Sequence, residues 1–391
     1  MNAKLFSISL LAVGVLLAGA SPASASGYKF TDLGALGGGG GGDSSIAMGI
    51  NNSGQVAGST YTSGVMHAII WNGTTPTDLG GGIYSFGLGI NDSGQVVGSS
   101  DILGGDHHAT LWNGTTPTDL GTLGGSNSQA WDINDSGQVV GRSGTIGNAV
   151  AHATLWNGTT PTDLGTLGGS NSIGLGINDS GQVVGSSDIL GGDSHATIWN
   201  GTTPTDLGTL GGSNSVGFRI NDSGQVVGWS LTTGNAVQHA TLWNGTTPTD
   251  LGTLGGSNSW AYGINSYAYD INNSGQVVGF SEYSNFTSTV HATIWNGAAP
   301  TDLNNFLSVS DVDAGWFLAT ATSINDNGWI AGSAGNRVTG AQVAYLLTPC
   351  DTCPINIYPL PLIPEPETYA MFMAGLGLMG FIARRRKNGQ A

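Results

Sequence analysis

The sequence predicts an all-β protein, a seven-bladed β-propeller closed by its own N-terminal strand. Thr-Asp-Leu recurs seven times, and each copy is followed by an Ile-Asn turn segment and by a strand similar to His-Ala-Thr-Leu-Trp. The array opens on a Thr-Asp-Leu strand and closes on the strand that should precede another one, Val343 to Leu347. Such ends can complete one shared sheet, so we expect a closed ring. The copies begin at Thr31, Thr77, Thr118, Thr162, Thr205, Thr249 and Thr301.

The first 25 residues have the pattern of a secretory signal peptide. Lys4 precedes an apolar stretch from Leu5 to Ala20, and small residues follow it. This order of a basic, an apolar and a small-residue region is typical of such signals. We therefore expect cleavage between Ala25 and Ser26 and export of the mature chain.

The unit that starts at Thr118 illustrates one repeat. We expect short strands at 118–123 and 128–133, a hairpin turn at the Asn-Asp-Ser-Gly segment 134–137, and further strands at 138–141 and 152–156. An Asn/Asp/Gly cluster between β-branched runs is a hairpin signal. Asn-Gly then reverses the chain again, since both residues tolerate positive φ. Four short strands without helical periodicity predict one propeller blade.

Stacking the blades would bury Trp112, Trp156, Trp199 and their equivalents between neighbouring sheets. We expect residues 31–36 to supply the missing strand beside residues 343–347, which removes the free edges. A parallel β-solenoid is the alternative. Solenoid coils are shorter, about 20 to 30 residues, and need no matched ends, so the propeller is favoured.

The charge balance excludes some partners. The segment 27–349 holds 4 basic and 22 acidic residues, a net charge of −18 by difference, which would repel nucleic acid and anionic lipid surfaces. Twelve of these acids occupy fixed repeat positions in Thr-Asp-Leu and Asn-Asp, so turn capping and solubility explain most of them. Calcium stays open as an alternative, although the spaced oxygen ligands of a calcium loop are absent.

Six histidines occupy the same place in six repeats. Because each belongs to a different blade, they cannot form one ligand set, and we expect neither a metal nor another cofactor. We expect each to bond within its own blade, to the Asp of a Thr-Asp-Leu strand. They are His67, His108, His152, His195, His239 and His291.

Two cysteines, Cys350 and Cys353, follow the last strand. They lack the four ligands of a structural zinc site, and no thioredoxin-like context surrounds them. An exported chain folds in an oxidising compartment, so we expect an intrachain disulfide that closes the exit of the array.

The repeats differ most in the connection before the His strand and in the longer sixth and seventh units. Variable propeller loops gather on one face, and loops carry recognition. Aromatic side chains there suit stacking on sugar rings and equally suit local packing. The candidate ligand-binding loop residues are Trp260, Tyr262, Tyr267 and Tyr269.

No nucleophile elbow, phosphate loop or zinc signature occurs in the sequence, so we expect no enzymatic activity. The alternative is a secreted carbohydrate-active enzyme, a propeller hydrolase or lyase. It would have to recruit residues such as Asp311, Asp313, Arg219 and Tyr269, and nothing in their spacing selects them.

The C-terminal end carries the most specific motif. Ile363 precedes Pro364, Glu365 and Pro366, an apolar run covers 369–383, and a basic cluster follows. This is a short membrane span whose basic end stays in the cytoplasm. The arrangement resembles the PEP-CTERM sorting signal, with Ile363 where valine is usual. The basic cluster is Arg384, Arg385, Arg386 and Lys387.

That resemblance implies recognition by an exosortase in the inner membrane of a Gram-negative bacterium. The tail, which crosses that membrane transiently, is then removed. The protein is released or attached at the cell surface or in the extracellular matrix. An ordinary tail anchor is the alternative.

The repeats between residues 31 and 347 also resemble the HAF repeat of exported bacterial proteins. Alanine follows each repeat histidine, but threonine mostly replaces the phenylalanine, as at Thr110 and Thr154, and Val343 replaces the histidine of the seventh copy. The resemblance implies fold and location and no activity.

We therefore expect four parts: a signal peptide (1–25), the repeat propeller (27–349), a Cys/Pro linker (350–363) and the sorting signal (364–391). The function expected is that of a non-enzymatic cell-surface or biofilm-matrix protein that binds polysaccharide or other matrix components.

Overall fold

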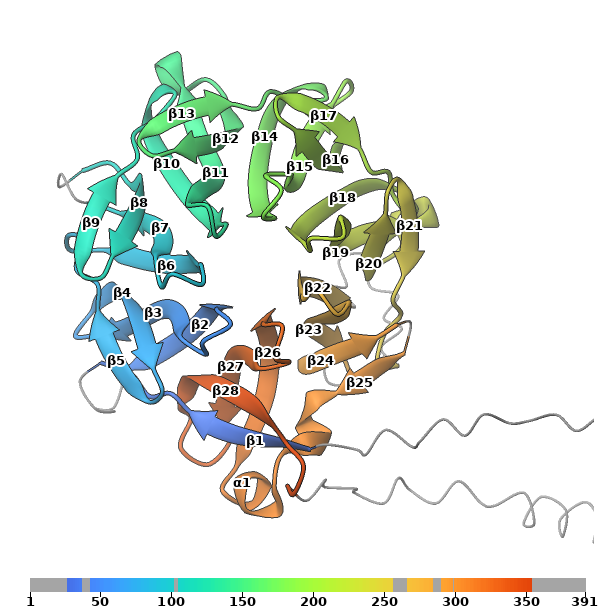
Figure 1. Cartoon of the computed structure of the whole chain (residues 1–391). Helices are drawn as coiled ribbons and strands as arrows, with labels where there is room; N and C mark the ends of the chain where they lie inside the picture. The colour runs from blue at the N-terminus through green and yellow to red at the C-terminus, as the bar shows by residue number, and fades with distance from the viewer. Residues whose placement is uncertain are drawn as a thin grey trace, which may run out of the picture.

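The computed structural model describes residues 27–36, 43–101, 105–255, 266–283, 290–297 and 299–353. Their strands form seven four-stranded antiparallel sheets, arranged as blades around a central axis (Figure 1). The prediction of a seven-bladed propeller is confirmed, and the solenoid alternative is wrong.

The first four blades follow one another along the chain. Blade 1 holds β2 (Ser44–Ile50), β3 (Val56–Thr62), β4 (Val65–Asn72) and β5 (Thr75–Asp78). Blade 2 holds β6 (Ser85–Ile90), β7 (Val96–Ser100), β8 (His108–Asn113) and β9 (Thr116–Asp119). Blade 3 holds β10 (Gly124–Ile133), β11 (Gln138–Thr145), β12 (Ala151–Asn157) and β13 (Thr160–Asp163), with the 3₁₀ turn η1 (Ile146–Asn148). Blade 4 holds β14 (Gly168–Ile177), β15 (Val183–Ile189), β16 (Ser194–Asn200) and β17 (Thr203–Asp206).

The last three blades close the ring. Blade 5 holds β18 (Gly211–Ile220), β19 (Gln225–Thr232), β20 (Gln238–Asn244) and β21 (Thr247–Asp250), with η2 (Thr233–Asn235). Blade 6 holds β22 (Ser266–Ile271), β23 (Gln276–Glu282), β24 (Val290–Asn296) and β25 (Pro300–Asp302). After η3 (Leu303–Phe306) and α1 (Val309–Asp313), blade 7 holds β26 (Trp316–Ile324), β27 (Ile330–Asn336), β28 (Gln342–Cys350) and β1 (Gly27–Asp32).

Each blade runs from the axis outward. The strand that ends in Ile-Asn is innermost, and the Thr-Pro-Thr-Asp strand is outermost (Figure 1). One face of the disc, here called the turn face, carries the turns between first and second and between third and fourth strands. The opposite loop face carries the connections between second and third strands and between blades. All variable connections in the described residues lie on the loop face, as predicted.

The N-terminal strand closes blade 7, but four residues earlier than predicted. β1 pairs antiparallel with β28, and Thr31 lies opposite Leu346. The strand ends at Asp32, because its carboxylate Oδ1 accepts the N–H of Gly34 at 2.8 Å and turns the chain. The predicted bounds 31–36 were therefore wrong, although the pairing partner was right.

The same turn corrects the predicted strand 118–123. The strand is β9, which ends at Asp119, where the carboxylate accepts the Gly121 N–H at 2.8 Å. In every blade where it occurs, this aspartate turn carries the chain from the outermost strand towards the next innermost one.

Tryptophans fill the space between blades. Trp71, Trp112, Trp156, Trp199, Trp243 and Trp295 are all fully buried, and Tyr345 takes the seventh place. Trp156, for example, belongs to blade 3 but packs with Val97, Ala109 and Leu120 of blade 2 and its outgoing connection. The predicted burial of these side chains between sheets is confirmed, and it explains why a single blade would have no core of its own.

The six repeat histidines also lie as predicted. In each of blades 1 to 6 the imidazole Nδ1 lies 2.6 to 3.1 Å from a carboxylate oxygen of the outermost strand, as in His108 with Asp119. The same carboxylates cap the turn described above. Each pair therefore ties the two outer strands of a blade together.

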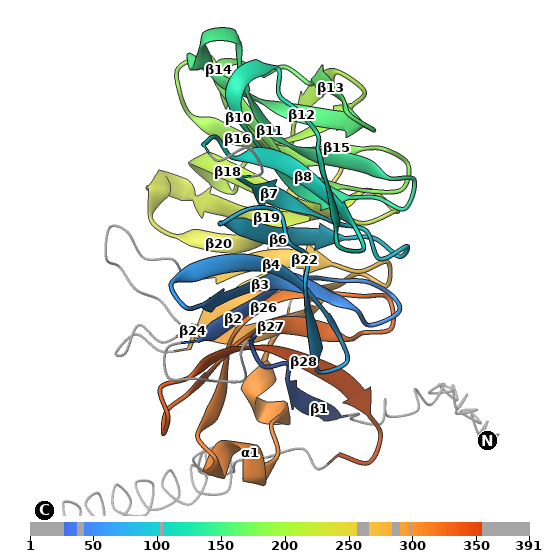
Figure 2. The same ribbon diagram turned by 90° about the vertical axis from the view of Figure 1, so that its left-hand side faces the viewer.

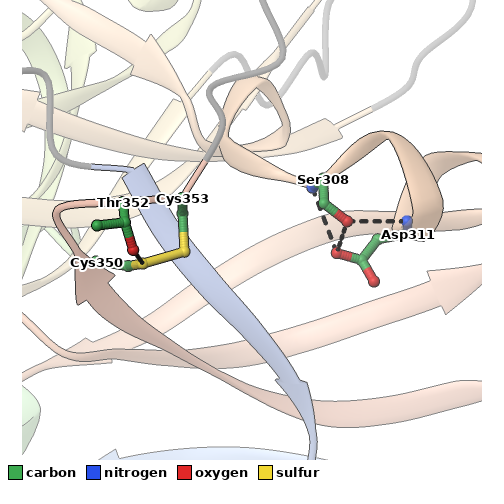
Figure 3. The surroundings of a disulfide bond; sticks show 5 residues. All are labelled: Ser308, Asp311, Cys350, Thr352 and Cys353. Atoms are coloured by element: carbon green, nitrogen blue, oxygen red, sulfur yellow. Dashed lines mark hydrogen bonds between the residues drawn. A yellow bond between two sulfur atoms is a disulfide. The ribbon is translucent and has the colours of Figure 1, made fainter.

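Cys350 and Cys353 form the predicted disulfide (Figure 3). The turn it closes packs on the start of β1, where a Cβ on Gly27 would lie 3.0 Å from the Cys353 carbonyl oxygen. In the same view, Ser308 and Asp311 form a capping box that begins α1. Figure 2 shows α1 beside blade 7, away from the other blades. None of the helices in the described ranges is long and apolar enough to cross a membrane.

Candidate functional site

Two cavities lie on opposite faces of the propeller. One, of about 190 Å³, opens on the turn face at the mouth of the central channel. The other, of about 570 Å³, is formed mainly by blades 2 and 3 near the loop face. Ligand sites usually measure roughly 300 to 1,000 Å³, so only the second has the size of one.

Buried asparagines line the channel mouth and join the blades. In each blade the asparagine after the innermost strand donates through Nδ2 to the main-chain carbonyl of its counterpart in the next blade, at 2.9 to 3.3 Å. Asn325 of blade 7 donates to Asn51 of blade 1, so the ring of seven bonds is closed. The ring members are Asn51, Asn91, Asn134, Asn178, Asn221, Asn272 and Asn325.

A second closed ring lies outside the first. The N–H of each following residue donates to a side-chain oxygen of its counterpart in the next blade, at 2.8 to 3.1 Å. Burial raises the pKa of the Asp135 carboxyl, and the neighbouring acids raise it further. The ring holds Asn52, Asp92, Asp135, Asp179, Asp222, Asn273 and Asp326.

Four non-glycine side chains project into the channel below these rings, at the position before the isoleucine. They are Asp132, Arg219, Asp270 and Ser323. Arg219 donates to the carbonyl of Leu175 in the preceding blade, and its Nε lies 3.8 Å from Asp132 Oδ2.

The two channel carboxylates connect neighbouring blades. Asp132 accepts the Ile177 N–H at 3.0 Å, and Asp270 accepts the Ile324 N–H at 2.9 Å and the Ser323 hydroxyl at 2.7 Å. Burial raises the pKa of both carboxyls, while the Arg219 charge opposes that rise. These charges are thus already engaged within the protein.

The channel carboxylates therefore contribute to the contacts between neighbouring blades. Each carboxylate named above accepts a bond from the next or preceding blade, and no group of three or more potential metal ligands occurs in the described part of the chain. The four residues named for a possible enzyme do not lie together in one site. Arg219 lies in the channel, Asp311 and Asp313 lie in α1 beside blade 7, and Tyr269 lies in β22.

The loop-face cavity has a different lining. Side chains from β6 and β7 of blade 2 meet side chains from β10, β11 and the following loop of blade 3, with one residue from blade 4. Amides, hydroxyls, one imidazole, one guanidinium and one phenyl ring contribute. The residues with the chemically informative side chains are Phe86, His107, Gln129, Arg142, Asn148 and Asn171.

Gln129 and Arg142 are the central pair of this cavity. They lie directly opposite each other on β10 and β11, so their side chains project from the same face of blade 3. Neither side chain has a hydrogen bond or an ion pair within the described residues, and the same holds for the His107 ring. Arg142 is exposed to solvent. These three polar groups are free to bind a ligand.

The corresponding place between blades 5 and 6 explains why the cavity exists. There, Trp229, Tyr267 and Phe280 occupy the repeat positions of Ser99, Gln129 and Arg142, and their rings pack with centroids 5.1 and 5.9 Å apart. The aromatic rings fill the space in one pair of blades. The smaller and polar side chains leave it open in the other.

This cluster also corrects a prediction. Tyr267 and Tyr269 do not lie in a ligand-binding loop but in strand β22, where they contact Phe218 and Phe280. Burial raises the pKa of Tyr269 to about 12. The sequence reasoning assigned them to a loop because the sixth unit is longer, but the additional residues precede the strand. Trp260 and Tyr262 lie outside the described residues.

Sequence reasoning missed Gln129 and Arg142, and also the channel residues Asp132 and Asp270. A comparison of the repeats could have identified these four residues, because each of them occupies a position that is apolar, small or glycine in several other copies. Such a break in a repeat marks a position that the common fold does not require.

The loop face also carries the exposed large apolar side chains. In the described ranges all of them lie at strand ends or connections on this face, whereas the turn face shows polar turns. They are Ile46, Tyr61, Ile83, Tyr84, Ile146, Leu190, Tyr283, Val309 and Val338.

The remaining predicted positions fall outside the described residues. These are the cleavage site Ala25–Ser26, the sorting motif Pro364–Pro366, and the basic cluster Arg384–Lys387.

Comparison with known protein families gives two partial matches. Residues 362–387 match the PEP-CTERM protein-sorting motif, which indicates that the chain is an exosortase-sorted protein, exported to the cell envelope or the extracellular space. Residues 211–348, from β18 of blade 5 into β28 of blade 7, match a family of proteins of unknown function, DUF3466. The HAF resemblance was not found in this comparison and stays a prediction.

Comparison with curated proteins gives no match. Among solved structures, the chain is similar to the acylaminoacyl peptidase of Pyrococcus horikoshii, with 11% identity and a TM-score of 0.35. The similarity covers 78% of this chain and 45% of that protein. At this level it carries no argument about function.

Proposed function

We propose that this exosortase-sorted propeller is a non-enzymatic protein of the cell surface or biofilm matrix that binds polysaccharide in the loop-face cavity. The observation that carries the proposal is the set of unpartnered polar side chains, Gln129, Arg142 and His107, in a cavity of about 570 Å³. Amide and guanidinium groups suit the many hydroxyl groups of a sugar, and the Phe86 ring adds an apolar surface.

The lining of the cavity favours binding over hydrolysis. Glycosidases generally use two carboxyl groups, one on each side of the scissile bond. The described residues that line the loop-face cavity include neither aspartate nor glutamate. The channel carboxylates lie near the opposite face and already accept hydrogen bonds. The competing function, a secreted carbohydrate-active enzyme, therefore has less support.

Processing is tested by intact-mass spectrometry of the native protein from culture medium and from the cell envelope, in hosts with and without the exosortase. We expect a tail shortened near Pro364, together with protein outside the cell, only when the exosortase is present. A full-length tail retained in the membrane fraction of the normal host would contradict the surface or matrix assignment.

Binding is tested by affinity electrophoresis of the secreted protein in gels that contain the host's own extracellular polysaccharide. We expect retardation that is weakened by Gln129→Ala and unchanged by Gln342→Ala, a matched substitution at an exposed position of β28. Release of reducing ends from the same polymer is measured in parallel. Absence of retardation would refute binding, and turnover by the parent protein would support the enzyme instead.

A further inference from the structure

Arg142 differs from the other arginines in the described residues. The Arg219 guanidinium donates to two carbonyls and lies near Asp132, and the Arg337 guanidinium lies over the Phe317 ring, 4.9 Å from its centroid. Arg142 has no such partner, although it lies in a body that carries 22 acidic residues between positions 27 and 349. The Arg142 guanidinium is therefore available to pair with an anionic group of a ligand.

The side chains that line the cavity around Arg142 are not acidic, although Asp106 precedes the lining residue His107 and Asp188 accepts from the lining residue Asn171. The described cavity lining has no carboxylate, and the residue directly across the strand pair is the neutral Gln129. The repeat position of Arg142 is serine in blades 1, 2, 4 and 7 and aromatic in blades 5 and 6, so the fold does not need a cation there. The positive charge is specific to this one cavity.

We propose that the loop-face cavity recognises an acidic sugar, and that the Arg142 guanidinium pairs with the carboxylate of a uronic acid unit. This inference rests on the proposed polysaccharide binding and names the class of polymer. A guanidinium presents two parallel N–H donors that match the two oxygens of a carboxylate. The Gln129 amide beside it can donate to a hydroxyl of the same sugar.

The net negative charge of the protein does not prevent this pairing. Repulsion between an acidic polymer and those aspartates that lie more than a Debye length away, about 8 Å at physiological ionic strength, is largely screened. The pair at Arg142 is in direct contact, at a distance well below the Debye length, so it is screened less than those distant charges. The acidic body therefore disfavours anionic polymers elsewhere more than at the loop-face cavity, where Arg142 lies.

The test uses the secreted protein and two probes that differ in one group: polygalacturonate, and the same polymer with its carboxyl groups reduced to alcohols. Dissociation constants are measured by affinity electrophoresis at 0.15 M salt. We expect tighter binding of the acidic polymer. We expect Arg142→Gln to weaken that binding about 10- to 100-fold, the range for a hydrogen-bonded charge pair, and to leave binding of the reduced polymer unchanged.

Two further variants make the outcome specific. Arg337→Gln removes the same charge away from the cavity and should have no effect. Arg142→Lys keeps the charge but cannot form the two parallel bonds, so we expect intermediate affinity. Because Arg142 is exposed, its variants should unfold at the parent's urea midpoint, which is checked by fluorescence.

The failures of the two proposals are distinguishable. If the parent binds neither probe nor the host polymer, both the proposed function and this inference are refuted. If it binds the acidic and reduced polymers equally, or if Arg142→Gln and Arg337→Gln weaken binding to the same extent, polysaccharide binding stands and recognition of the carboxylate is refuted.

Discussion

Removing one side chain from the ring of buried asparagines should destabilise the whole propeller. Asn178 accepts the Gln182 N–H at 2.9 Å and the Ser180 hydroxyl at 2.8 Å, and it donates to the Asn221 carbonyl in the next blade at 3.2 Å. Alanine would leave the Gln182 N–H without its acceptor, whereas the Asn221 carbonyl would keep its bond from the Gly224 N–H at 2.9 Å. An unsatisfied buried group costs about 1 to 3 kcal/mol, and water can reach part of the turn, so we expect a loss of about 2 kcal/mol.

The closing link of the ring gives a stricter version of this prediction. Asn325 accepts the Trp329 N–H and donates to the Asn51 carbonyl, both at 2.9 Å, across the junction where the last blade meets the first. If the ring is closed in solution, Asn325→Ala should cost as much as Asn178→Ala. An open ring would lose less, since the bond to the Asn51 carbonyl would already be absent, although the Trp329 N–H would still lose its acceptor.

The assay is urea unfolding of the purified protein, followed by tryptophan fluorescence and by circular dichroism to check that one transition is seen. Asn157→Ala, at an exposed turn without side-chain bonds in the described residues, is the control and should stay within about 0.5 kcal/mol of the parent. The reasoning is refuted if both ring variants match this control. A smaller loss for Asn325→Ala than for Asn178→Ala would show that blades 7 and 1 separate.

Three further substitutions test other contacts. Gly185→Ala would make its Cβ clash with the Ile173 carbonyl oxygen and should cost about 2 to 3 kcal/mol in urea unfolding, whereas Gly105→Ala, with open space around it, should cost almost nothing. Tyr345→Phe should stabilise by about 1 kcal/mol, because the buried hydroxyl has no hydrogen-bond partner among the described residues; destabilisation would reveal one. Burial would raise the pKa of Asp250, but bonds from His239 and a backbone N–H lower it overall, so its stabilisation is present above the unfolded pKa of about 4 and is lost as the pH falls through the folded value. Asp250→Asn should therefore cost less than about 1 kcal/mol at pH 6, after allowance for solvent screening, and nothing in strong acid; a cost that is independent of pH would contradict the ion pair.

The architecture could be predicted from the sequence because the same few structural motifs recur in every repeat. One Trp, one Val-Val-Gly and one Thr-Asp-Leu would be weak signals, but their recurrence gives the strand number and the out-of-phase ends give the closure. The His–Asp pairs followed from the same periodicity. Strand ends were less predictable, since the aspartate turn that ends each outer strand depends on a side-chain bond.

The candidate site could not be predicted in the same way. Gln129 and Ser99 are far apart in the sequence and meet only because blades 2 and 3 stack. The cavity between them exists because these blades lack the aromatic rings that fill the same place between blades 5 and 6. Periodicity describes what the copies share. A site that arises where one copy departs from the others is visible only after the copies are placed side by side.

The two faces differ because their polar groups have different partners. On the turn face, asparagines and carboxylates form hydrogen bonds with the N–H and carbonyl groups of neighbouring blades. A substitution there should therefore weaken the closed ring of blades before it affects ligand binding. On the loop face, Gln129 and Arg142 hold nothing together in the described structure, so the fold tolerates other residues at their positions, as the other blades show. Recognition can therefore change at these positions without loss of the ring. It follows that cavity variants and ring variants should separate cleanly in experiment, the former altering affinity at constant stability and the latter altering stability first.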